Sequence, residues 1–380
     1  MDFQGIFFDT KDFKLLKRHR LGKGAFGIVY LAENKQDHHL YAAKIIDVED
    51  NFDGNDQMQI MRESSILSKL NHIAVVKFIG VNFRSFEDSA ILQPAIITEY
   101  IKNGSLKAIL DQEKEGTVDH EWTPSKKYIC LLGICSAMKY LHLKGVLHRD
   151  LKPENVLIDD EYFPKVCDFG LSRCFPESLS KSMNLAVTGQ IGTPLYMAPE
   201  LLDDEEKYGT GVDVYAFSIL AYEIVAGKQP FYELGKDLNA ITLRQKVLNG
   251  DRPSLSDDIP ENMQKLLQRC WSQNPNERPS FDEIFQLLSS DFSYSPEDVD
   301  EDEVNNYLEM IDDSLEKEEN KSNKINDKIF NDCLEISRRK LEKASDLIDI
   351  FASACEEGNI EIVEYFITNK LIDINTIIVL

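Results

Sequence analysis

The feature that most constrains this chain is the stretch from His148 to Gly170, which runs H-R-D-L-K-P-E-N-V-L-I-D-D-E-Y-F-P-K-V-C-D-F-G. It contains two carboxylates, Asp150 and Asp168. Between them lie the cation Lys152 and the amide Asn155. The apolar run V-L-I is short enough for a strand, and the following D-D favours a turn. A loop, a β-hairpin and a second loop would bring the four polar side chains to one end of a cleft.

These groups are the ones that phosphoryl transfer requires: an acceptor for the hydroxyl proton, oxygen and amide ligands for magnesium, and positive charge on the moving phosphate. Either H-R-D or D-F-G alone occurs by chance, with a structural salt bridge as the alternative. Together, at this separation and joined by L-K-P-E-N, they are specific. The stretch resembles the catalytic loop and the magnesium-binding D-F-G of the eukaryotic protein kinases. A kinase fold without activity is the alternative left open.

The resemblance implies an α+β, bilobal fold with a small β-rich lobe and a large helical lobe. It runs from about Phe13 to Leu288, so we expect a protein kinase domain over residues 13–288. An acidic linker over 289–323 and an all-α, ankyrin-like tail over 324–380 would follow. At 380 residues the chain is long enough for a two-lobed unit with an appendage.

The resemblance also implies a role for each polar group of the central stretch. Asp150 is the catalytic base that orients the substrate hydroxyl, and Lys152 stabilises charge on the transferring phosphoryl group. Asn155 and Asp168 hold magnesium. The expected cofactors are therefore ATP and Mg²⁺.

A glycine-rich turn between two strands is predicted over residues 21–30, L-G-K-G-A-F-G-I-V-Y. Its glycines allow backbone amides to approach phosphates closely, where a side chain would block them. A dinucleotide-binding turn shares the G-x-G-x-x-G spacing but requires a helix directly afterwards. Here the following I-V-Y-L-A is typical of a strand, which favours the turn of a kinase.

Lys44 lies inside the apolar strand L-Y-A-A-K-I-I, where an ammonium group is costly unless it is paired. A helix predicted from Asp56 to Leu70 places Glu63 within reach of it. In kinases this lysine grips the α- and β-phosphates and the helix glutamate orients it. The resemblance assigns these two catalytic roles to Lys44 and Glu63, with a solvated charge on the helix surface as the alternative for Glu63.

The segment A-I-I-T-E-Y-I-K-N-G-S-L resembles the hinge between kinase lobes, with Thr98 at the gatekeeper position and residues 99–101 presenting backbone groups to adenine. The resemblance implies a set of residues in contact with ATP. They are Leu21, Gly22, Lys23, Gly24, Ala25, Phe26, Gly27, Val29, Ala42, Lys44, Thr98, Glu99, Tyr100, Ile101 and Leu157.

Three features of the large lobe are expected to be structural. Apolar spacing over Lys126–Leu143 predicts a long buried helix that leads to the catalytic loop. Asp213 opens another buried helix and is expected to cap the backbone of the catalytic loop. Glu200 and Arg278 match a salt bridge of the family.

The substrate class follows from the resemblance. Lys152 and Thr193, the latter in G-T-P-L-Y-M-A-P-E, resemble a serine/threonine kinase. The segment C-W-S-Q-N-P-N-E-R-P-S-F is shared in style with tyrosine kinases. The combination resembles the tyrosine-kinase-like group, which is mostly Ser/Thr-specific, and dual specificity stays open. The protein partner is therefore a substrate bearing Ser or Thr.

The activation segment runs from Asp168 to Glu200, and its polar middle offers four hydroxyls for regulatory phosphorylation. A phosphate there could pair with Arg149 and order the segment, and a permanently ordered segment is the alternative. The candidate sites are Ser178, Ser180, Ser182 and Thr188.

The net charge of −24 is unevenly distributed along the chain. Residues 291–320 hold thirteen acidic residues and one lysine, a net −12, which is half of the excess. This argues against nucleic acid or an anionic membrane as a general partner. The simplest interpretation of the acidic run is a solvated linker.

The seven cysteines show no C-x-x-C pairing or metal-ligand spacing. With no apolar signal segment and no run long enough to span a bilayer, they indicate reduced thiols and a cytoplasmic protein. Cys167 directly precedes Asp168. A buried, inert thiol is the favoured interpretation, and a reactive thiol beside the nucleotide is the alternative.

The tail resembles part of one ankyrin repeat in A-S-A-C-E-E-G-N-I-E-I-V-E-Y-F-I-T-N-K-L-I-D-I-N. A single repeat cannot bury its apolar face alone. It would therefore pack on a preceding helix predicted over Lys324–Ile348, or belong to a longer array. An ordinary helical hairpin is the alternative, and a protein partner is expected to bind here.

Overall fold

The structure is a computed structural model that describes residues 7–24, 27–46, 60, 64, 67–87, 92–168, 173–174, 194–203, 208–237 and 239–316. The chain divides into two units, of which the larger spans Phe8–Ile311. The smaller combines Met1–Phe7 with Asp312–Leu380, and only Phe7 and residues 312–316 of it are described. The predicted ankyrin-like tail over 324–380 lies outside the described residues.

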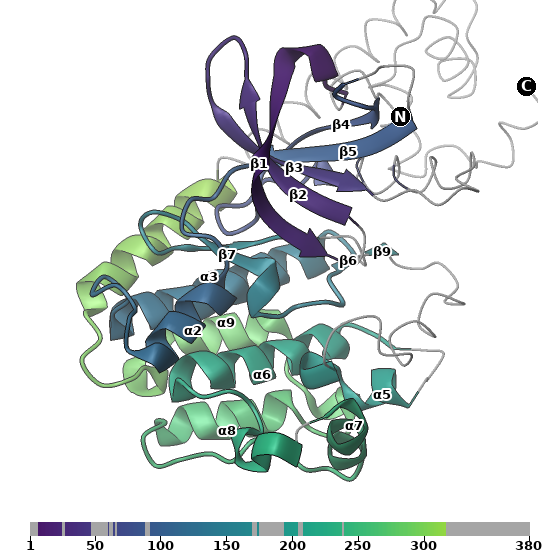
Figure 1. Cartoon of the computed structure of the whole chain (residues 1–380). Coiled ribbons are helices and arrows are strands. Elements are labelled where there is room, and N and C mark those ends of the chain that lie inside the picture. Colours follow the sequence, from purple (N-terminus) through teal and green to yellow (C-terminus); the bar gives the residue numbers. More distant parts are fainter. Residues whose placement is uncertain are drawn as a thin grey trace, which may run out of the picture. The chain divides into compact units, whose positions relative to one another are not determined.

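Five antiparallel strands form a sheet of order β1-β2-β3-β5-β4 in one lobe of the larger unit (Figure 1). The strands are β1 (Phe13–Gly24), β2 (Gly27–Asn34), β3 (Leu40–Ile46), β4 (Phe78–Arg84) and β5 (Leu92–Glu99). The predicted glycine-rich turn and the strand around Lys44 are confirmed by β1, β2 and β3. Val75 lies before β4 and forms only an isolated bridge to Val166.

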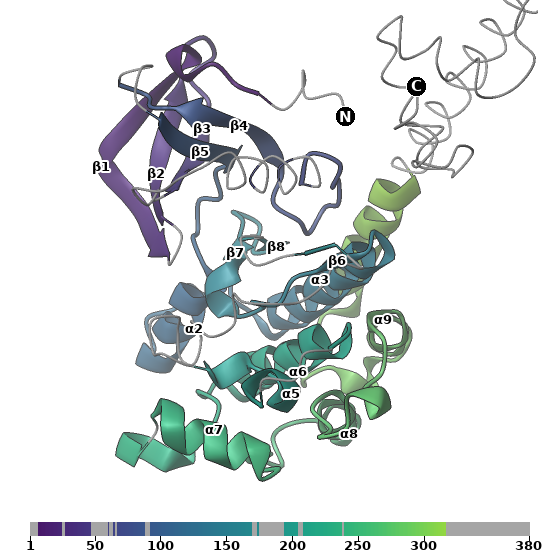
Figure 2. The same ribbon diagram turned by 90° about the vertical axis from the view of Figure 1, so that its right-hand side faces the viewer.

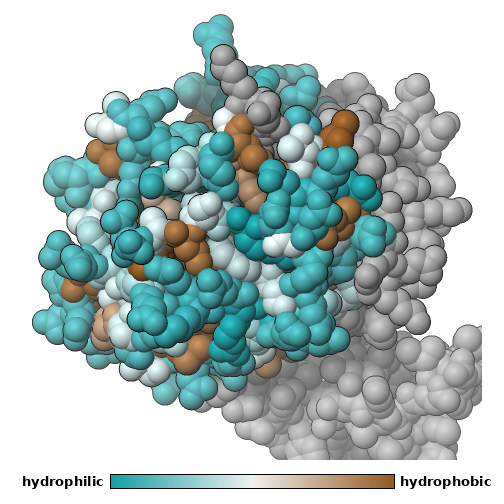
Figure 3. All heavy atoms as spheres, turned by 90° about the horizontal axis from the view of Figure 1, so that it is seen from below, coloured by the Kyte–Doolittle hydropathy of each residue, from teal (hydrophilic) through white to brown (hydrophobic). Residues whose placement is uncertain are grey.

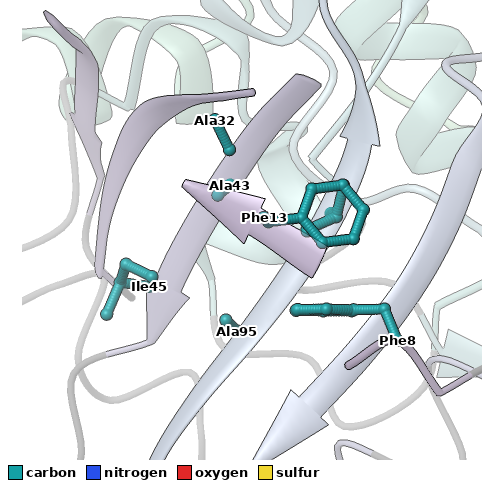
Figure 4. Packing of buried hydrophobic residues seen from close by; sticks show 7 residues of the cluster. Phe8, Phe13, Ala32, Ala43, Ile45 and Ala95 are labelled. Atoms are coloured by element: carbon teal, nitrogen blue, oxygen red, sulfur yellow. The ribbon is translucent and has the colours of Figure 1, made fainter. Parts of the chain in front are cut away.

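An apolar core covers one face of this sheet. Strand alternation places Ala43 and Ile45 on the buried face, opposite to their neighbour Lys44. Figure 4 shows Phe8 and Phe13 packed over these residues, and their rings meet edge to face at 5.3 Å. Because the core occupies one face, the polar functional residues of the sheet lie on the other.

Helices dominate the second lobe of the larger unit (Figure 1). They are α2 (Leu106–Glu115), α3 (Pro124–Leu143), α5 (Pro199–Leu202), α6 (Gly211–Ala226), α7 (Ala240–Leu248), α8 (Glu261–Cys270) and α9 (Phe281–Ser290). Short 3-10 turns occur at η1 (Thr10–Asp12), η2 (Pro153–Asn155), η3 (Pro194–Tyr196), η4 (Tyr232–Asp237), η5 (Pro275–Glu277) and η6 (Phe292–Tyr294).

The long helix α3 confirms the prediction for Lys126–Leu143 and begins two residues earlier. Thr123 caps its first turn, because the hydroxyl accepts a hydrogen bond from the amide of Lys126 at 3.2 Å. Pro124 at the first helical position suits a site where no amide donor is needed. An unbroken run from Tyr128 to Met138 is buried, as expected for a helix that is apolar on all sides.

Two small antiparallel pairs lie between the sheet and the helices. β7 (Val156–Ile158) and β8 (Pro164–Val166) form the predicted hairpin, and β6 (Val146–Leu147) pairs with β9 (Arg173–Cys174). The carboxylate of Asp159 accepts from the amides of Glu161 and Phe163 and closes the turn of the hairpin. This side chain explains why D-D ends the strand.

The acidic stretch after α9 differs from its interpretation as a solvated linker. Residues 301–316 form a helix, and Val304, Tyr307 and Ile311 on it are at most 1% exposed. The interpretation is wrong for residues 301–311, because three apolar side chains three and four positions apart supply a face that packs. The acidic residues around them stay at the surface.

The surface seen from below is mainly hydrophilic, with isolated hydrophobic residues where it is coloured (Figure 3). Within the part of the chain that the structure describes, no helix is both long enough and apolar enough to cross a bilayer.

The connection that leads into β4 is fastened to the helical lobe at His72. Its Nδ1 accepts from the amide of Ala74 at 3.1 Å, so its Nε2 carries the proton toward the hydroxyl of Ser136, also at 3.1 Å. The ring stacks on Tyr140, whose hydroxyl accepts from the amide of Asn71. Both ring nitrogens are therefore used by a neutral, buried imidazole.

This buried histidine predicts a pH-dependent stability. Burial, with the charge of Lys165 second, lowers the pKa of His72 from 6.5 to about 4. Between these values only the unfolded chain binds the proton, so the free energy of unfolding should fall by up to about 3 kcal/mol as pH drops from 6.5 to 4. Denaturant titrations across this range should show a shallower pH dependence for His72→Asn. The exposed His120→Asn serves as control, and an unchanged slope for His72→Asn would contradict the assignment.

Candidate active site

The catalytic loop is held by one buried carboxylate. Asp213, in the first turn of α6, is 0% exposed and accepts from the amides of His148 and Arg149 at 3.0 and 2.7 Å. It also contacts Nε2 of His142 at 2.9 Å. Burial alone raises the pKa of an aspartate, but these partners, His142 foremost, keep the pKa of Asp213 below its ordinary 3.8. The predicted capping role of Asp213 is confirmed.

His148 ties the two loops of the central stretch together. Its Nδ1 accepts from the amide of Asp150 at 3.3 Å, so Nε2 donates to the carbonyl of Cys167 at 3.0 Å. The side chain is fully buried, as a positioning role requires. The residue before Asp168 is thus fixed from inside the catalytic loop.

Asp150, Lys152 and Asn155 form one hydrogen-bonded group. Nζ of Lys152 lies 2.7 Å from Oδ2 of Asp150. Nδ2 of Asn155 donates to the backbone carbonyl of Asp150 at 2.7 Å and to its Oδ2 at 2.8 Å. Because both donations use the amide nitrogen, the oxygen Oδ1 of Asn155 is left as the ligand-type atom.

Asp168 joins this group from the far end of the β7–β8 hairpin. Val156 pairs with Val166, and the amide of Cys167 donates to the carbonyl of Asn155 at 2.9 Å. The backbone of Asp168 has a φ of 61°, in the left-handed region that is strained for a residue with a side chain. Nζ of Lys44, from the small-lobe sheet, lies 2.5 Å from its Oδ1. The structure therefore places Lys44 and Asp168 in direct contact, with Asn155 beside them.

A divalent cation fits this arrangement by chemistry. Asn155 and Asp168 offer one amide oxygen and one carboxylate, the hard ligands that Mg²⁺ takes when phosphates supply further oxygens. Among the described residues no group of three or more His, Cys, Asp or Glu is arranged to hold a metal. With these two protein ligands alone, the site would need oxygens of a bound phosphate to complete the coordination of the cation.

Strand register gathers the expected nucleotide contacts of the sheet on one face. Val29 pairs with Lys44, and Ala42 pairs with Thr98. Paired residues share a face, as do residues two apart, so all four lie opposite to the apolar core. Leu157 reaches the hinge side through a bridge to Ser105.

The glycines of the turn between β1 and β2 serve different purposes. Gly27 has a φ of 147°, and a Cβ there would lie 1.9 Å from the carbonyl oxygen of Ile45. Glycine is thus required at this position by the neighbouring strand. Nothing lies within 4 Å of a Cβ at Gly22, which is consistent with a surface kept clear for a ligand.

The hinge carboxylate is used within the protein. Glu99 accepts from the amide of Lys77 at 2.8 Å and lies 3.6 Å from Nζ of Lys165. Its backbone amide donates to the carbonyl of Lys77 at 3.0 Å. The side chain of Glu99 therefore fixes the hinge, and its backbone carbonyl, which accepts from the Thr98 hydroxyl at 3.3 Å, has a second lone pair for an adenine.

Cys167 has the inert character favoured from the sequence. The residue keeps some exposed surface, but burial, followed by the charge of Asp168, raises the pKa of its thiol well above 9.0. Since the thiolate is the reactive form, the thiol is a poor nucleophile near neutral pH.

Several predicted residues lie outside the described part of the chain. They are Glu63, Ala25, Phe26, Thr193, Ser178, Ser180, Ser182 and Thr188. The proposed pairing of Glu63 with Lys44 thus stays a prediction. The predicted bridge between Glu200 and Arg278 is confirmed, with two contacts of 2.6 and 2.8 Å.

Sequence reasoning missed His142, because its partner Asp213 is 71 positions away and no motif links the two. It also missed Asn103, whose amide donates to the carbonyl of Asp159 at 2.7 Å and fastens the hinge to the hairpin. The N-G-S sequence was a local signal for a turn at Asn103, but nothing in the sequence indicated that its partner is Asp159.

Comparison with known proteins gives a consistent result. The family model for the protein kinase domain matches residues 15–289. The chain is 36% identical over 272 residues to a probable serine/threonine-protein kinase of Dictyostelium discoideum, covering 71% of this chain and 27% of that protein.

Two further relatives are a dual specificity protein kinase, shkB, of the same organism and a putative serine/threonine-protein kinase/receptor of Acanthamoeba polyphaga mimivirus. The first is 34% identical over 280 residues, covering 73% of this chain and 40% of its own length. The second is 30% identical over 272 residues, covering 71% of this chain and 15% of its own length. The chain therefore spans less than half the length of these relatives.

Removing the charge of Asp213 should misplace the catalytic loop. In Asp213→Asn an NH₂ group replaces one carboxylate oxygen and faces the N–H donors that this oxygen accepted from. We therefore expect a loss of about 2–4 kcal/mol in the free energy of unfolding and at least about a tenfold loss of kcat. Denaturant titration and steady-state phosphorylation of a peptide measure the two effects. The exposed Asp258→Asn is the control, and parent-like kcat in Asp213→Asn would contradict the capping role.

Proposed function

The chain belongs to the protein kinase family, and we propose that it transfers the γ-phosphoryl group of ATP to serine and threonine hydroxyls of proteins, with Mg²⁺ as the divalent cation. Protein kinase domains use ATP and a divalent metal. The observation that carries the proposal is the contact of Lys44 with Asp168 beside the hydrogen-bonded group of Asp150, Lys152 and Asn155.

Each side chain has a distinct part in this proposal. Asp150 orients the acceptor hydroxyl and takes up its proton, and Lys152 supplies positive charge where negative charge develops. Lys44 binds phosphate oxygens, and Asn155 with Asp168 would hold the cation, which neutralises phosphate charge. The catalytic loop contributes position more than chemistry, since phosphoryl transfer requires alignment and electrostatic stabilisation.

Specificity for serine and threonine is supported by Lys152, which lies within hydrogen-bond distance of the catalytic carboxylate. Two of the relatives are named as serine/threonine-protein kinases, and one is named as having dual specificity. Membership of the tyrosine-kinase-like group and a cytoplasmic location are part of the same proposal, on the motifs of the sequence. The tail over 324–380 is proposed to bind a protein partner through its ankyrin-like segment.

The proposal predicts that Asp150→Asn strongly slows transfer without abolishing ATP binding. Loss of the proton acceptor should lower kcat by about 100-fold or more. A peptide library incubated with labelled ATP and Mg²⁺ measures transfer, and calorimetry measures ATP affinity. The exposed Asp160→Asn is the control. A parent protein that binds ATP but phosphorylates neither Ser nor Thr would instead indicate a nucleotide-binding scaffold.

Regulation by phosphorylation of the activation segment is proposed for Ser178, Ser180, Ser182 or Thr188, with Thr188 and Ser182 favoured. Arg149, beside the catalytic aspartate, is the cation that would pair with such a phosphate, and its guanidinium now lies 5.1 Å from the ring centre of Tyr208. Changing all four residues to alanine should lower kcat severalfold. Phosphatase treatment should lower the activity of the parent and leave that of the variant unchanged. Full turnover by the variant would refute this regulation.

A further inference from the structure

The helix over residues 301–316 lies beyond the end of the protein kinase domain match at residue 289. Its residues up to Ile311 belong to the same compact unit as both lobes. Val304, Tyr307 and Ile311 are 0%, 1% and 0% exposed. Burial this complete is typical of a domain core and requires a partner surface within the unit.

The partner surface is on α3. The amide of Asp300 donates to the hydroxyl of Ser125 at 2.8 Å, and Nζ of Lys126 lies 3.0 Å from Oε1 of Glu303. Lys126 also lies over the ring of Phe163, 4.5 Å from its centre. Figures 1 and 2 both show the yellow-green helix alongside α3. One lysine thus joins the acidic helix to the β7–β8 turn.

Gly133 of α3 provides a notch for Tyr307. A Cβ at Gly133 would lie 2.3 Å from the hydroxyl oxygen of Tyr307 and 2.5 Å from Cγ of Pro164. The rings of Tyr307 and Phe163 are 4.7 Å apart between centres. The Tyr307 hydroxyl has no hydrogen-bond partner among the described residues, so the side chain is held there by packing.

The residues that Tyr307 contacts belong to the hairpin that carries the cation ligands. Phe163 directly precedes β8 and Pro164 begins it. Asn155 directly precedes β7, and Asp168 follows β8 by two residues. At its other end the hairpin is held by the small lobe, where the amide of Val76 donates to the carbonyl of Val166 at 2.9 Å. Because Asn155 and Asp168 flank the same short hairpin, displacing its turn would shift these two residues together.

We propose that residues 300–311 form an intramolecular clamp that holds the β7–β8 hairpin against α3, with Tyr307 as a positioning residue for Asn155 and Asp168. The proposal rests on the proposed function in that it assigns these two residues to the cation. It makes the catalytic unit longer than the family match, because the clamp covers the Gly133 face of α3. The acidic charges of the helix keep its outer face in water.

The test compares Tyr307→Ala with Tyr307→Phe in the full chain, and with Met310→Ala on the exposed face of the same helix. At a temperature well below every melting transition, kcat and the apparent KM for ATP are measured against Mg²⁺ concentration. We expect Tyr307→Ala to lose about tenfold or more in kcat/KM for ATP and to need more Mg²⁺, with KM for the peptide unchanged. Tyr307→Phe should behave as the parent, because the hydroxyl makes no hydrogen bond to the described residues.

A second variant, Gly133→Ala in α3, adds a methyl group where the Tyr307 side chain packs. Gly133→Ala should reproduce the defect of Tyr307→Ala, and adding Tyr307→Phe should restore part of it by removing the atom nearest to the new methyl group. If Tyr307→Ala does not fold, Tyr307→Leu takes its place. Folded variants with the Mg²⁺ and ATP dependence of the parent would overturn the clamp.

Failure of the proposed function would be recognised separately. If the parent transfers no phosphate, the readout becomes the Mg²⁺ dependence of its affinity for ATP, measured by calorimetry. A weaker, more Mg²⁺-demanding affinity in Tyr307→Ala would still support the clamp, and an unchanged affinity would refute it.

Discussion

The candidate active site depends on the hydrogen bonds that the buried carboxylate of Asp213 accepts from the backbone of the catalytic loop. The backbone at Arg149 has a φ of 67°, a conformation that is unfavourable for a residue with a side chain. The charge-assisted hydrogen bonds from the amides of His148 and Arg149 offset this strain, and α6 supplies the rigid platform. Without a fixed acceptor at this point, nothing would stabilise the left-handed backbone of the loop that carries Asp150.

A short series of hydrogen bonds connects this loop to the hairpin. His148 donates to the carbonyl of Cys167, the backbone amide of Cys167 donates to the carbonyl of Asn155, and Nδ2 of Asn155 donates to Oδ2 of Asp150. The loop before the hairpin and the loop after it are therefore one rigid assembly. Lys44 reaches this assembly from the sheet, which couples the position of the small lobe to the geometry of the carboxylate at Asp168.

The elements that the sequence predicts well are those with local signals. The apolar run around Lys44, the turn signal after Ile158 and the apolar spacing of α3 all act within a few residues, and each predicted the right element. The helix over 301–316 was not foreseen, because its three apolar residues are diluted by acidic ones. Its partner, the Gly133 face of α3, becomes visible only when the chain is folded.

The same division applies to the site. Motif spacing predicted that Asp150, Asn155 and Asp168 lie close together and that Asp213 caps the loop, since short loops leave few ways to arrange them. The structure adds a reason for glycine at position 27 that the sequence did not predict. It comes from the carbonyl of Ile45 on the neighbouring strand, so it follows from strand pairing, which no local pattern encodes.

The environment of Cys167 has a consequence for chemical probes of this protein. An electrophile designed to form a thioether bond with the residue before Asp168 would meet a protonated sulfur whose burial opposes ionisation. Oxidants that act on thiolates would be slowed for the same reason. A covalent ligand aimed at this position would therefore have to hold its electrophile close to a thiol that ionises poorly, and the position gains time against oxidants.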